Sequence, residues 1–279
     1  AETAVALWRA LRPAARRVPV VRTVHNSEYW RCWPRIGRWC DGHLRDATVV
    51  AVSAAAREEF LRQQVRFRRA GERVEPPVIY NGIAAPRLAP RPGPRQANEC
   101  RLLFAGRFEE QKGLDVLGAA LPLVRLPAGG RGVLRLIGRG SLQPMAERLA
   151  QRPPAGWRVE LSGPVAEIAP EYSAADLAVL PSRFEGLGLV SIEATLAGLP
   201  VIVADAPGLR ETVPPNHPWL VPPADAAALA DAISRAVDGC PAWEPAVRAA
   251  QDLAATRFSP ARMAEAYARI YRHAVRRPA

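Results

Sequence analysis

The sequence contains no long hydrophobic run. Its longest apolar stretches, such as TVVAVSAAA from Thr48, are much shorter than the roughly 18 to 20 consecutive residues that a membrane-spanning helix requires. The opening AETAVALWRALRPAARR mixes charges into an amphipathic pattern, unlike the unbroken apolar core of a signal peptide. We therefore expect a soluble, cytoplasmic protein with no membrane-spanning segment.

Paired cysteines and metal-binding patterns are missing as well. The four cysteines are scattered, without the short paired spacings of a zinc site, and four thiols do not make a disulfide framework in a chain of 279 residues. No D-x-D pair occurs, and the four histidines are dispersed. We therefore expect no bound metal ion and no other cofactor.

Lysine is almost absent, because Lys112 is the only one among 38 basic residues. The net charge of +11 would ordinarily suggest a nucleic-acid or membrane partner. Abundant Arg, Ala and Pro are instead typical of a GC-rich genome, and no nucleic-acid recognition motif accompanies the charge. We expect no nucleic-acid partner, whereas peripheral contact with the inner face of a membrane is compatible with the charge.

Strand and helix patterns alternate along the chain, and its 49% of apolar residues are enough for two globular domains. In the first part, VPVVRTVH from Val18, ATVVAVS up to Ser53 and PVIYNG are typical of strands. Between the last two we expect a helix with Ser53 as its N-cap and Gly71 as its C-cap. Residues 1–84 are therefore predicted to form a first α/β domain, and the Pro-rich residues 85–98 a linker.

Residues 99–257 predict a second α/β domain. Five short apolar strands, RLLFAG, GVLRLIG, WRVELSG, DLAVLPS and PVIVAD, are separated by helix-length segments. Such alternation favours a doubly wound parallel sheet, whose ligand site lies at the carboxyl ends of the strands. Residues 258–279, with Ser259 as a candidate N-cap, are predicted to form a terminal helix.

Two cations follow the first strand of the second domain. After Gly106 come Arg107 and, five residues later, Lys112. The planar fork of an arginine and the point charge of a lysine together suit a diphosphate leaving group. Arginine is common in this chain, so two solvated surface cations are the alternative. The position of the only lysine favours the functional interpretation.

A second pattern, PSRFEGLGLVSIEA, holds Glu185 and Glu193 around glycines. If a helix begins near Gly188, the backbone N–H groups of Gly188, Leu189 and Val190 form an anion site at the positive end of the helix dipole. Glu193 then faces the same ligand and can accept hydrogen bonds from a ribose diol, while Glu185 can hold hydroxyls of a sugar. Two glutamates at this spacing are also common on protein surfaces.

Two further features are less specific. His25 ends the strand PVVRTVHN and would lie opposite the phosphate site if the two sheets face each other, although a lone histidine is usually structural. The segment LIGRGS resembles part of a dinucleotide-binding fingerprint, but Gln143 stands where the third glycine belongs. We expect a tight strand-to-helix turn there.

Taken in order, the segments FAGRFEEQKG, LIGRGS, LSGPV, YSAADLAVLPSRFEGLGLVSIEATLAGLPVIVAD and PGLRETV closely resemble the retaining GT-B glycosyltransferases of family 4, group 1. The likeness is dense over residues 100–237, and TVHN, VAVS and YNGI resemble markers of that family's first domain. It implies an α/β fold of two Rossmann-like, doubly wound parallel-sheet domains that face a cleft. The helix of residues 258–279 would pack back on the first domain.

The resemblance implies catalytic roles for four residues. Arg107 and Lys112 would bind the donor diphosphate and stabilise it as it departs. Glu185 would hold the donor sugar, and His25 would reach that sugar from the first domain. Because no carboxylate is obviously placed as a nucleophile, the donor phosphate itself would help to deprotonate the acceptor.

Other residues would bind the donor without taking part in the chemistry. By the same resemblance, Glu193 would hold the ribose, whereas Pro164 and Val165 would flank the nucleobase. Further donor contacts would come from Gly106, Gly188, Leu189 and Val190. Leu187 replaces a frequent Phe of the family, which should alter the packing of the sugar pocket more than the chemistry.

The chain departs from the family in length. The family's first domain usually has several strand and helix units and a glycine-rich loop before the histidine strand, but few residues precede that strand here. We therefore expect an incomplete first domain that lacks much of the acceptor site and leaves a sheet edge exposed. A short protein that is completed by a partner subunit is the alternative.

The sequence thus predicts a glycosyltransferase that moves a sugar from a nucleoside diphosphate donor to a hydroxyl acceptor, with retention and without metal. A sugar or a lipid-linked sugar fits as the acceptor. Two alternatives stay open: a sugar-nucleotide-binding subunit without turnover, and a sugar-nucleotide epimerase of GT-B type.

Overall fold

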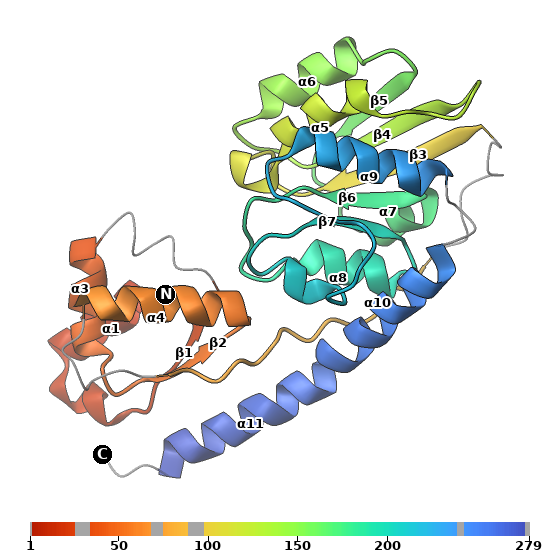
Figure 1. The fold of residues 1–279 in the computed structure, drawn as a ribbon. Helices are drawn as coiled ribbons and strands as arrows, with labels where there is room; N and C mark the ends of the chain where they lie inside the picture. The colour runs from red at the N-terminus through yellow and green to blue at the C-terminus, as the bar shows by residue number, and fades with distance from the viewer. Residues whose placement is uncertain (1, 26–33, 68–74, 89–97, 239–242, 277–279) are drawn as a thin grey trace. The chain divides into compact units, whose positions relative to one another are not determined.

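The structure, a computed structural model, describes residues 2–25, 34–67, 75–88, 98–238 and 243–276. These residues fall into two compact units (Figure 1). The first unit comprises residues 1–82 together with 258–279, and the second unit comprises residues 83–257. Residues 83–88, which lead into the second unit, have no regular secondary structure.

The first unit contains a small parallel sheet covered by helices. Strands β1 (Val21–Val24) and β2 (Thr48–Ala51) pair in parallel, with Val21 opposite Thr48. The helical elements are α1 (Glu2–Leu11), η1 (Pro13–Arg17), α3 (Pro34–His43), α4 (Ala54–Phe67) and α11 (Pro260–Arg276). The predicted N-cap of α4 is confirmed, because the Ser53 hydroxyl accepts a hydrogen bond from the backbone N–H of Ala56 at 2.9 Å.

One expected strand of the first unit is reduced to a single bridge. PVIYNG pairs with β2 only where Val78 lies opposite Ala51. The bridge has two hydrogen bonds, from the N–H of Ala51 to the carbonyl of Pro77 and from the N–H of Ile79 back to Ala51. Pro77 itself has no N–H to donate, which limits how far such a ladder extends. Gly71, the expected C-cap of the preceding helix, lies outside the described residues.

The last helix, α11, belongs to the first unit. The hydroxyls of Thr23 and Tyr267 are 3.1 Å apart, so α11 is hydrogen-bonded to β1. Gly82 packs against the first turn of the helix so closely that a Cβ atom there would lie 2.4 Å from the Cα of Pro260. A glycine is therefore required where the chain leaves the first unit.

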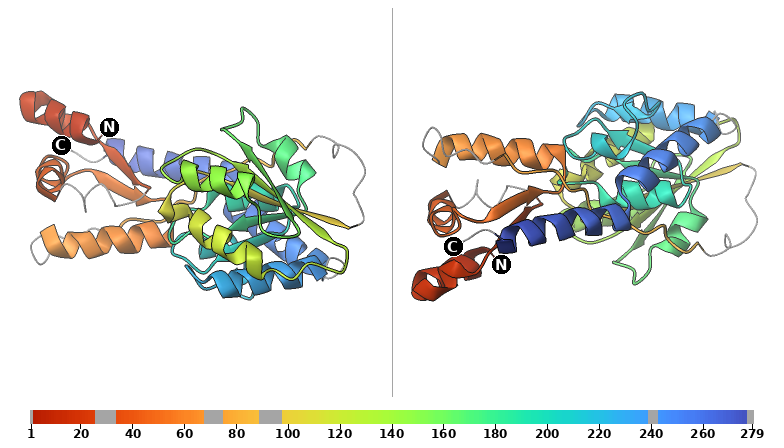
Figure 2. Two further views of the ribbon diagram at one scale, coloured as in Figure 1. Left: turned by 90° about the horizontal axis from the view of Figure 1, so that it is seen from above. Right: turned by 90° about the horizontal axis from the view of Figure 1, so that it is seen from below.

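The second unit is built on one parallel sheet of six strands in the order β5-β4-β3-β6-β7-β8 (Figures 1 and 2). The strands are β3 (Glu99–Ala105), β4 (Arg131–Ile137), β5 (Trp157–Ser162), β6 (Leu177–Leu180), β7 (Val201–Ala204) and β8 (Leu220–Val221). The first five of these are the predicted strands. Strand β8 was not predicted, because its two residues are too few to show a pattern.

Helices cover both faces of this sheet. They are α5 (Leu114–Ala120), α6 (Gln143–Gln151), α7 (Ala169–Ala174), α8 (Leu189–Leu196), α9 (Ala226–Asp238) and α10 (Trp243–Arg257). Short 3-10 helices are η2 (Glu110–Lys112), η3 (Leu121–Leu123) and η4 (Arg210–Thr212). Leu102 and Phe104 of β3 pack in one core cluster with α5 and α9, whereas Leu103 packs in another with α7 and α8. Burial on both faces explains the continuous apolar strand sequences.

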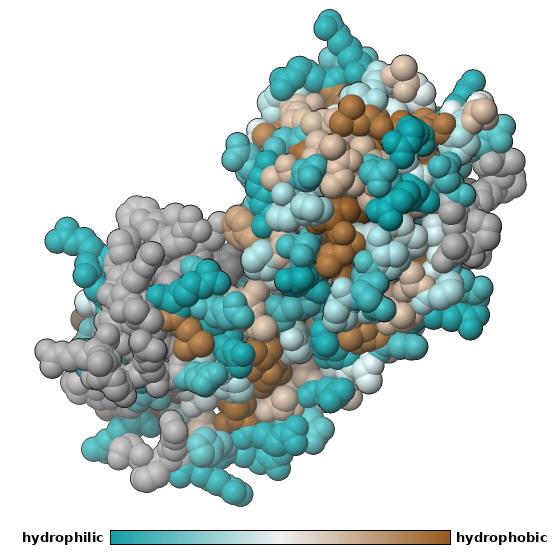
Figure 3. Space-filling view, viewed as in Figure 1, coloured by the Kyte–Doolittle hydropathy of each residue, from teal (hydrophilic) through white to brown (hydrophobic). Residues whose placement is uncertain are grey.

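The outer surface is mostly polar. On the face that Figure 3 shows, hydrophilic residues predominate and the hydrophobic ones form small groups. Among the described helices, none combines the length and the apolar character that crossing a bilayer demands.

Candidate functional site

The strand order places the topological switch point of the sheet between β3 and β6. From β3 the chain winds outward through β4 and β5, and from β6 it winds to the other side through β7 and β8. The loops that follow β3 and β6 therefore run in opposite directions. Open α/β sheets bind ligands at such a point, at the carboxyl ends of the strands. Residues 106–112 follow β3 and residues 181–188 follow β6, so the two sequence patterns meet at this point.

Glycines allow the loops at this edge to pack closely. Gly113 has a φ of 71°, and a Cβ atom there would lie 2.1 Å from the carbonyl oxygen of Pro181. Gly138 has a φ of 150°, and a Cβ atom there would lie 1.8 Å from the carbonyl oxygen of Gly106. The turn LIGRGS therefore packs against the loop after β3 and does not form a separate phosphate-binding loop.

Lys112 and Glu185 form an ion pair across the two loops. The Lys112 Nζ lies 2.6 Å from Glu185 Oε1, and the Ser182 hydroxyl donates to the same oxygen at 2.9 Å. The two charged side chains are only 20% and 10% exposed. The only lysine of the chain is therefore not an isolated surface cation, because it is held against a largely buried carboxylate.

Arg107 is exposed and is tied to the same loops through Gln111. One Arg107 Nη donates to Gln111 Oε1 at 2.8 Å, and Gln111 Nε2 donates to the carbonyl of Phe184 at 3.1 Å. Gln111 connects the loop after β3 with the loop after β6, and sequence reasoning missed it. A side-chain amide carries no signal in a single sequence that would mark such a connection.

A second ion pair supports this arrangement from the side. Arg183 donates to both carboxylate oxygens of Asp115, at 2.8 and 2.6 Å. Hydrogen bonding to Arg183, followed by its charge, lowers the pKa of Asp115. The pair fixes residue 183 two positions before Glu185, so the β6 loop is anchored on both sides of Phe184.

Helix α8 begins where the glycine pattern predicts. Its N-cap is Gly188 and its first residue is Leu189. In the described structure the N–H groups of Leu189 and Val190 have no backbone acceptor, as is usual for a first helical turn. Glu193 lies on the same helix, and its Oε2 accepts a hydrogen bond from the Tyr172 hydroxyl at 2.9 Å.

Tyr172 was not singled out from the sequence. Its side chain is buried, and burial, together with the nearby charge of Glu193, raises the pKa of its hydroxyl. The hydroxyl therefore stays protonated and donates to the carboxylate. Glu193 Oε1 has no recorded partner among the described residues.

The remaining predicted residues lie at separate places. Pro164 is exposed after β5, whereas Val165 is half-buried and packs against the core cluster of α7 and α8. Leu187 is buried. His25 is exposed directly after β1, in the first unit, whereas all the other predicted site residues belong to the second unit.

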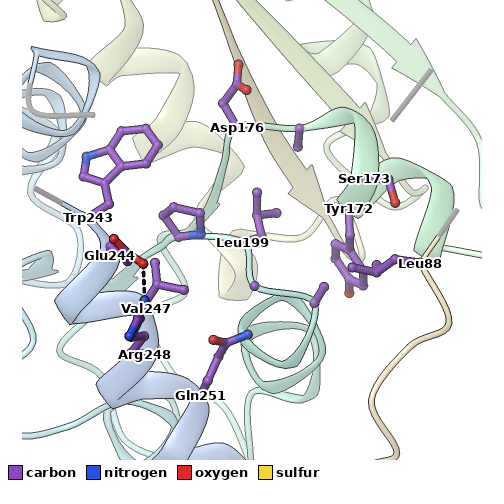
Figure 4. Close-up of a pocket in the computed structure, with 14 residues that line it drawn as sticks. Leu88, Tyr172, Ser173, Asp176, Leu199, Trp243, Glu244, Val247, Arg248 and Gln251 are labelled. Atoms are coloured by element: carbon purple, nitrogen blue, oxygen red, sulfur yellow. Dashed lines mark hydrogen bonds and ion pairs between the residues drawn. The ribbon is translucent and has the colours of Figure 1, made fainter. Parts of the chain in front are cut away.

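One hollow of the second unit lies away from this site. Its volume is about 600 Å³, and residues such as Asp176 and Pro200 place it at the amino ends of β6 and β7. Figure 4 shows that Trp243, Val247 and Arg248 of α10 line one side of it. Two of its polar lining residues, Glu244 and Arg248, form an ion pair with each other. Within the described residues, no group of three or more side chains is arranged to hold a metal ion.

Comparison with known proteins defines the class. Residues 99–238 match the family described as "Glycosyl transferases group 1". The D-inositol 3-phosphate glycosyltransferase 1 of Catenulispora acidiphila is 30% identical over an alignment of 296 residues, which covers 95% of this chain and 69% of that protein. The chain therefore belongs to the group 1 glycosyltransferase family.

Two further likenesses support this assignment. The glycogen synthase of Mycobacterium tuberculosis is 30% identical over 270 residues, 91% of this chain, and this chain spans 63% of the length of that protein. The Anabaena protein Alr3699/HepE, solved in complex with UDP-glucose, has a TM-score of 0.78 at 24% identity. That alignment covers 98% of this chain and 77% of the other, and it confirms the predicted GT-B type of α/β fold.

We expect Gly138→Ala to destabilise the second unit more than Gly129→Ala does. The second substitution strains the backbone but brings the new Cβ atom close to no other atom. A Cβ atom at residue 138 would collide with the carbonyl of Gly106, whereas Gly129 has a φ of 74° and open space around it. Gly129→Ala should cost about 1 to 2 kcal/mol of unfolding free energy, and Gly138→Ala distinctly more. Urea unfolding of both variants measures this. Equal losses would show that the two loops are not in contact.

Proposed function

We propose that this chain is the donor-binding part of an enzyme that moves a sugar from a nucleoside diphosphate donor to a hydroxyl acceptor, with retention and without a metal ion. One observation carries the proposal: Lys112 and Glu185 meet at 2.6 Å at the switch point between β3 and β6. Family membership supplies the reaction class. A sugar or a lipid-linked sugar serves as the acceptor in this proposal.

In the proposed reaction Arg107 and Lys112 receive the negative charge of the departing diphosphate. Both cations are held in place before any ligand arrives, Lys112 by Glu185 and Arg107 by Gln111. In this proposal Lys112 reorients when the donor binds, so both cations are in place before negative charge develops on the leaving phosphate. When the diphosphate binds, Lys112 turns from Glu185 to the phosphate, and Glu185 accepts hydroxyls of the donor sugar instead.

The nucleoside is held by the elements around α8. Glu193 uses Oε1 for the ribose hydroxyls, since Tyr172 already occupies Oε2. The N–H groups of Gly188, Leu189 and Val190 add contacts to the donor, and the positive end of the helix dipole favours its negative charge. By the resemblance given above, Pro164 and Val165 flank the base, and Gly106 lies beside the diphosphate.

The retaining step uses the donor itself. Without a ligand, Glu185 Oε1 is bound by Lys112 and Ser182. In the proposed complex Glu185 accepts hydroxyls of the donor sugar, so we assign it no role as a nucleophile. The leaving phosphate therefore takes the proton of the acceptor hydroxyl on the same face of the sugar. His25 contributes from the first unit by contacting the donor sugar.

A chain that binds the nucleotide sugar without turnover is the second candidate. The observation that favours it is the two-stranded sheet of the first unit, which offers little surface for an acceptor. Release of nucleoside diphosphate from the donor, in the presence or absence of an acceptor, separates the two candidates. Inversion of configuration at one carbon of the donor sugar would instead indicate an epimerase.

We expect residues 1–279 to bind a nucleoside diphosphate, because Arg107, Lys112 and the α8 elements all lie in the second unit. Isothermal titration with UDP, GDP and ADP tests this, and UDP comes first because the related Anabaena structures contain it. Glu193→Ala should weaken binding about tenfold to a hundredfold by removing hydrogen bonds to a charged group. A folded sample that gives no heat with any of the three at millimolar concentration would contradict the proposal.

Lys112→Ala should lower turnover much more than donor affinity, because the charge that it meets grows as the glycosidic bond breaks. The expected loss is on the order of a hundredfold to a thousandfold in kcat, about 2.7 to 4 kcal/mol. Arg107→Ala should likewise lower kcat more than donor affinity. Steady-state kinetics of the full-length protein measures these values.

The matched control is Arg131→Ala, which removes an exposed cation at the amino end of β4 and should leave kcat unchanged. Lys112→Ala also leaves the Glu185 carboxylate without its cation. The double variant Lys112→Ala with Glu185→Gln should therefore bind the diphosphate more tightly than Lys112→Ala alone. Near-normal turnover of Lys112→Ala would assign the lysine a structural role only.

Tyr172→Phe tests how Glu193 is positioned. Without the hydroxyl, Glu193 loses the hydrogen bond that fixes Oε2, so the ribose contact should weaken by severalfold in Kd. The loss should appear with UDP but not with its 2′,3′-dideoxy analogue, which has no ribose hydroxyls to offer. Tyr271→Phe, on the exposed surface of α11, is the control. An equal loss with both ligands would mean that Tyr172 supports the fold rather than the ribose site.

A further inference from the structure

Arg139, in the turn after β4, has no role in the proposed reaction. It is one of four arginines that follow strands at the carboxyl edge of the second sheet, namely Arg107 after β3, Arg139 after β4, Arg183 after β6 and Arg210 after β7. Arg183 and Arg210 each form an ion pair with an aspartate. Among the described residues, no acidic side chain forms an ion pair with Arg107 or Arg139. Because Arg107 is assigned to the diphosphate, Arg139 is available to another part of the ligand.

The turn that carries Arg139 is fixed on both sides. The N–H of Gly138 donates to the carbonyl of Ser162, the last residue of β5, at 3.1 Å. The N–H of Phe108, in the loop after β3, donates to the carbonyl of Arg139 at 2.9 Å. Strand β4 itself lies between β3 and β5 in the sheet. Arg139 is therefore held between the loop that carries Arg107 and the loop after β5.

The guanidinium of Arg139 lies on the side of the loop after β5. A Cβ atom at Gly163 would be 3.6 Å from Arg139 Nη2, so the guanidinium packs beside a residue that has no side chain. Gly163 directly precedes Pro164 and Val165, the residues that are proposed to flank the nucleobase. The exposed guanidinium therefore brings its N–H donors next to the proposed base site.

We propose that Arg139 selects the nucleobase of the donor. It favours a base with a carbonyl oxygen at position 4 of a pyrimidine or position 6 of a purine over a base with an amino group there. This inference rests on the proposed function, because it requires a nucleotide whose base lies beside the loop after β5.

The chemistry of the guanidinium supports this selection. An arginine offers only donors, arranged in a planar fork. Guanine meets such a fork with two acceptors, O6 and N7, and uracil offers O4 as an acceptor. Adenine presents an amino group at position 6 and cytosine presents one at position 4, so a donor of the fork would face another donor. A base of the first kind therefore gains hydrogen bonds from Arg139 that a base of the second kind does not.

Isothermal titration with two matched pairs of nucleotides tests the proposal. UDP and CDP differ at position 4 of the pyrimidine, and IDP and ADP differ at position 6 of the purine. In the pair that binds more tightly, residues 1–279 should prefer the carbonyl base by about fivefold to a hundredfold in Kd, as expected for one such side-chain pairing. Arg139→Ala should bring the two Kd values of that pair within about twofold of each other.

Two further variants separate this role from a general effect of charge. Arg139→Lys keeps the charge but not the planar fork, so it should lower the preference severalfold while binding of the amino-base nucleotide changes little. Arg131→Ala removes an exposed cation from the other end of β4 and should leave all four Kd values unchanged. The three substituted side chains are exposed at these two positions, and circular dichroism checks that each variant is folded.

Three results would overturn the inference and leave the proposed function intact. The first is binding without a preference for the carbonyl base. The second is a preference that Arg139→Ala does not change, which would assign the selection to other groups. The third is an equal weakening of all four nucleotides by Arg139→Ala, which would place the guanidinium at a phosphate. A folded chain that binds none of the four would instead contradict the proposed function, and the inference would fail with it.

Discussion

The pairing of β3 with β6 is the constraint on which the second unit depends. The described register is short, with Leu102 opposite Leu177 and Leu103 opposite Ala178. All four residues are buried, so the hydrophobic effect holds the two strands side by side from both faces of the sheet. Because the chain turns away on opposite sides of this pair, the loops that follow must begin next to each other. The ion pairs of Lys112 with Glu185 and of Arg183 with Asp115 are built on that adjacency.

Two ion pairs of the site each join charged groups from different elements. Lys112 meets Glu185, and Arg183 meets Asp115, each across the β3 and β6 loops. Such pairs add little stability when they are exposed, but a partly buried charge without a partner costs several kcal/mol. The two ion pairs therefore order these loops without a ligand. A ligand that carries both negative charge and hydroxyl groups can replace each partner by an equivalent one.

Much of this arrangement could be predicted from the sequence, because local patterns determine it. Five strands of the second unit, the start of α8 and the carboxyl-edge position of the cations all follow from apolar runs, glycines and capping rules. The strand order does not follow from local patterns, since nothing local specifies that β3 and β6 are neighbours. Lys112 and Glu185 are 73 residues apart, so their ion pair could not be foreseen. The same holds for Tyr172 beside Glu193, and how His25 in the first unit relates to these residues stays a prediction.

The assignment of α11 to the first unit has a consequence for synthesis on the ribosome. The chain leaves the first unit at Gly82 and returns to it at Phe258, so the second unit is inserted between two parts of the first. Residues 83–257 can complete their sheet and core while the chain is still being made. Tyr267, whose hydroxyl is hydrogen-bonded to that of Thr23, emerges from the ribosome only afterwards. The part of the first unit that precedes Gly82 must therefore wait for α11, and the nascent chain carries an unfinished domain while residues 83–257 are made.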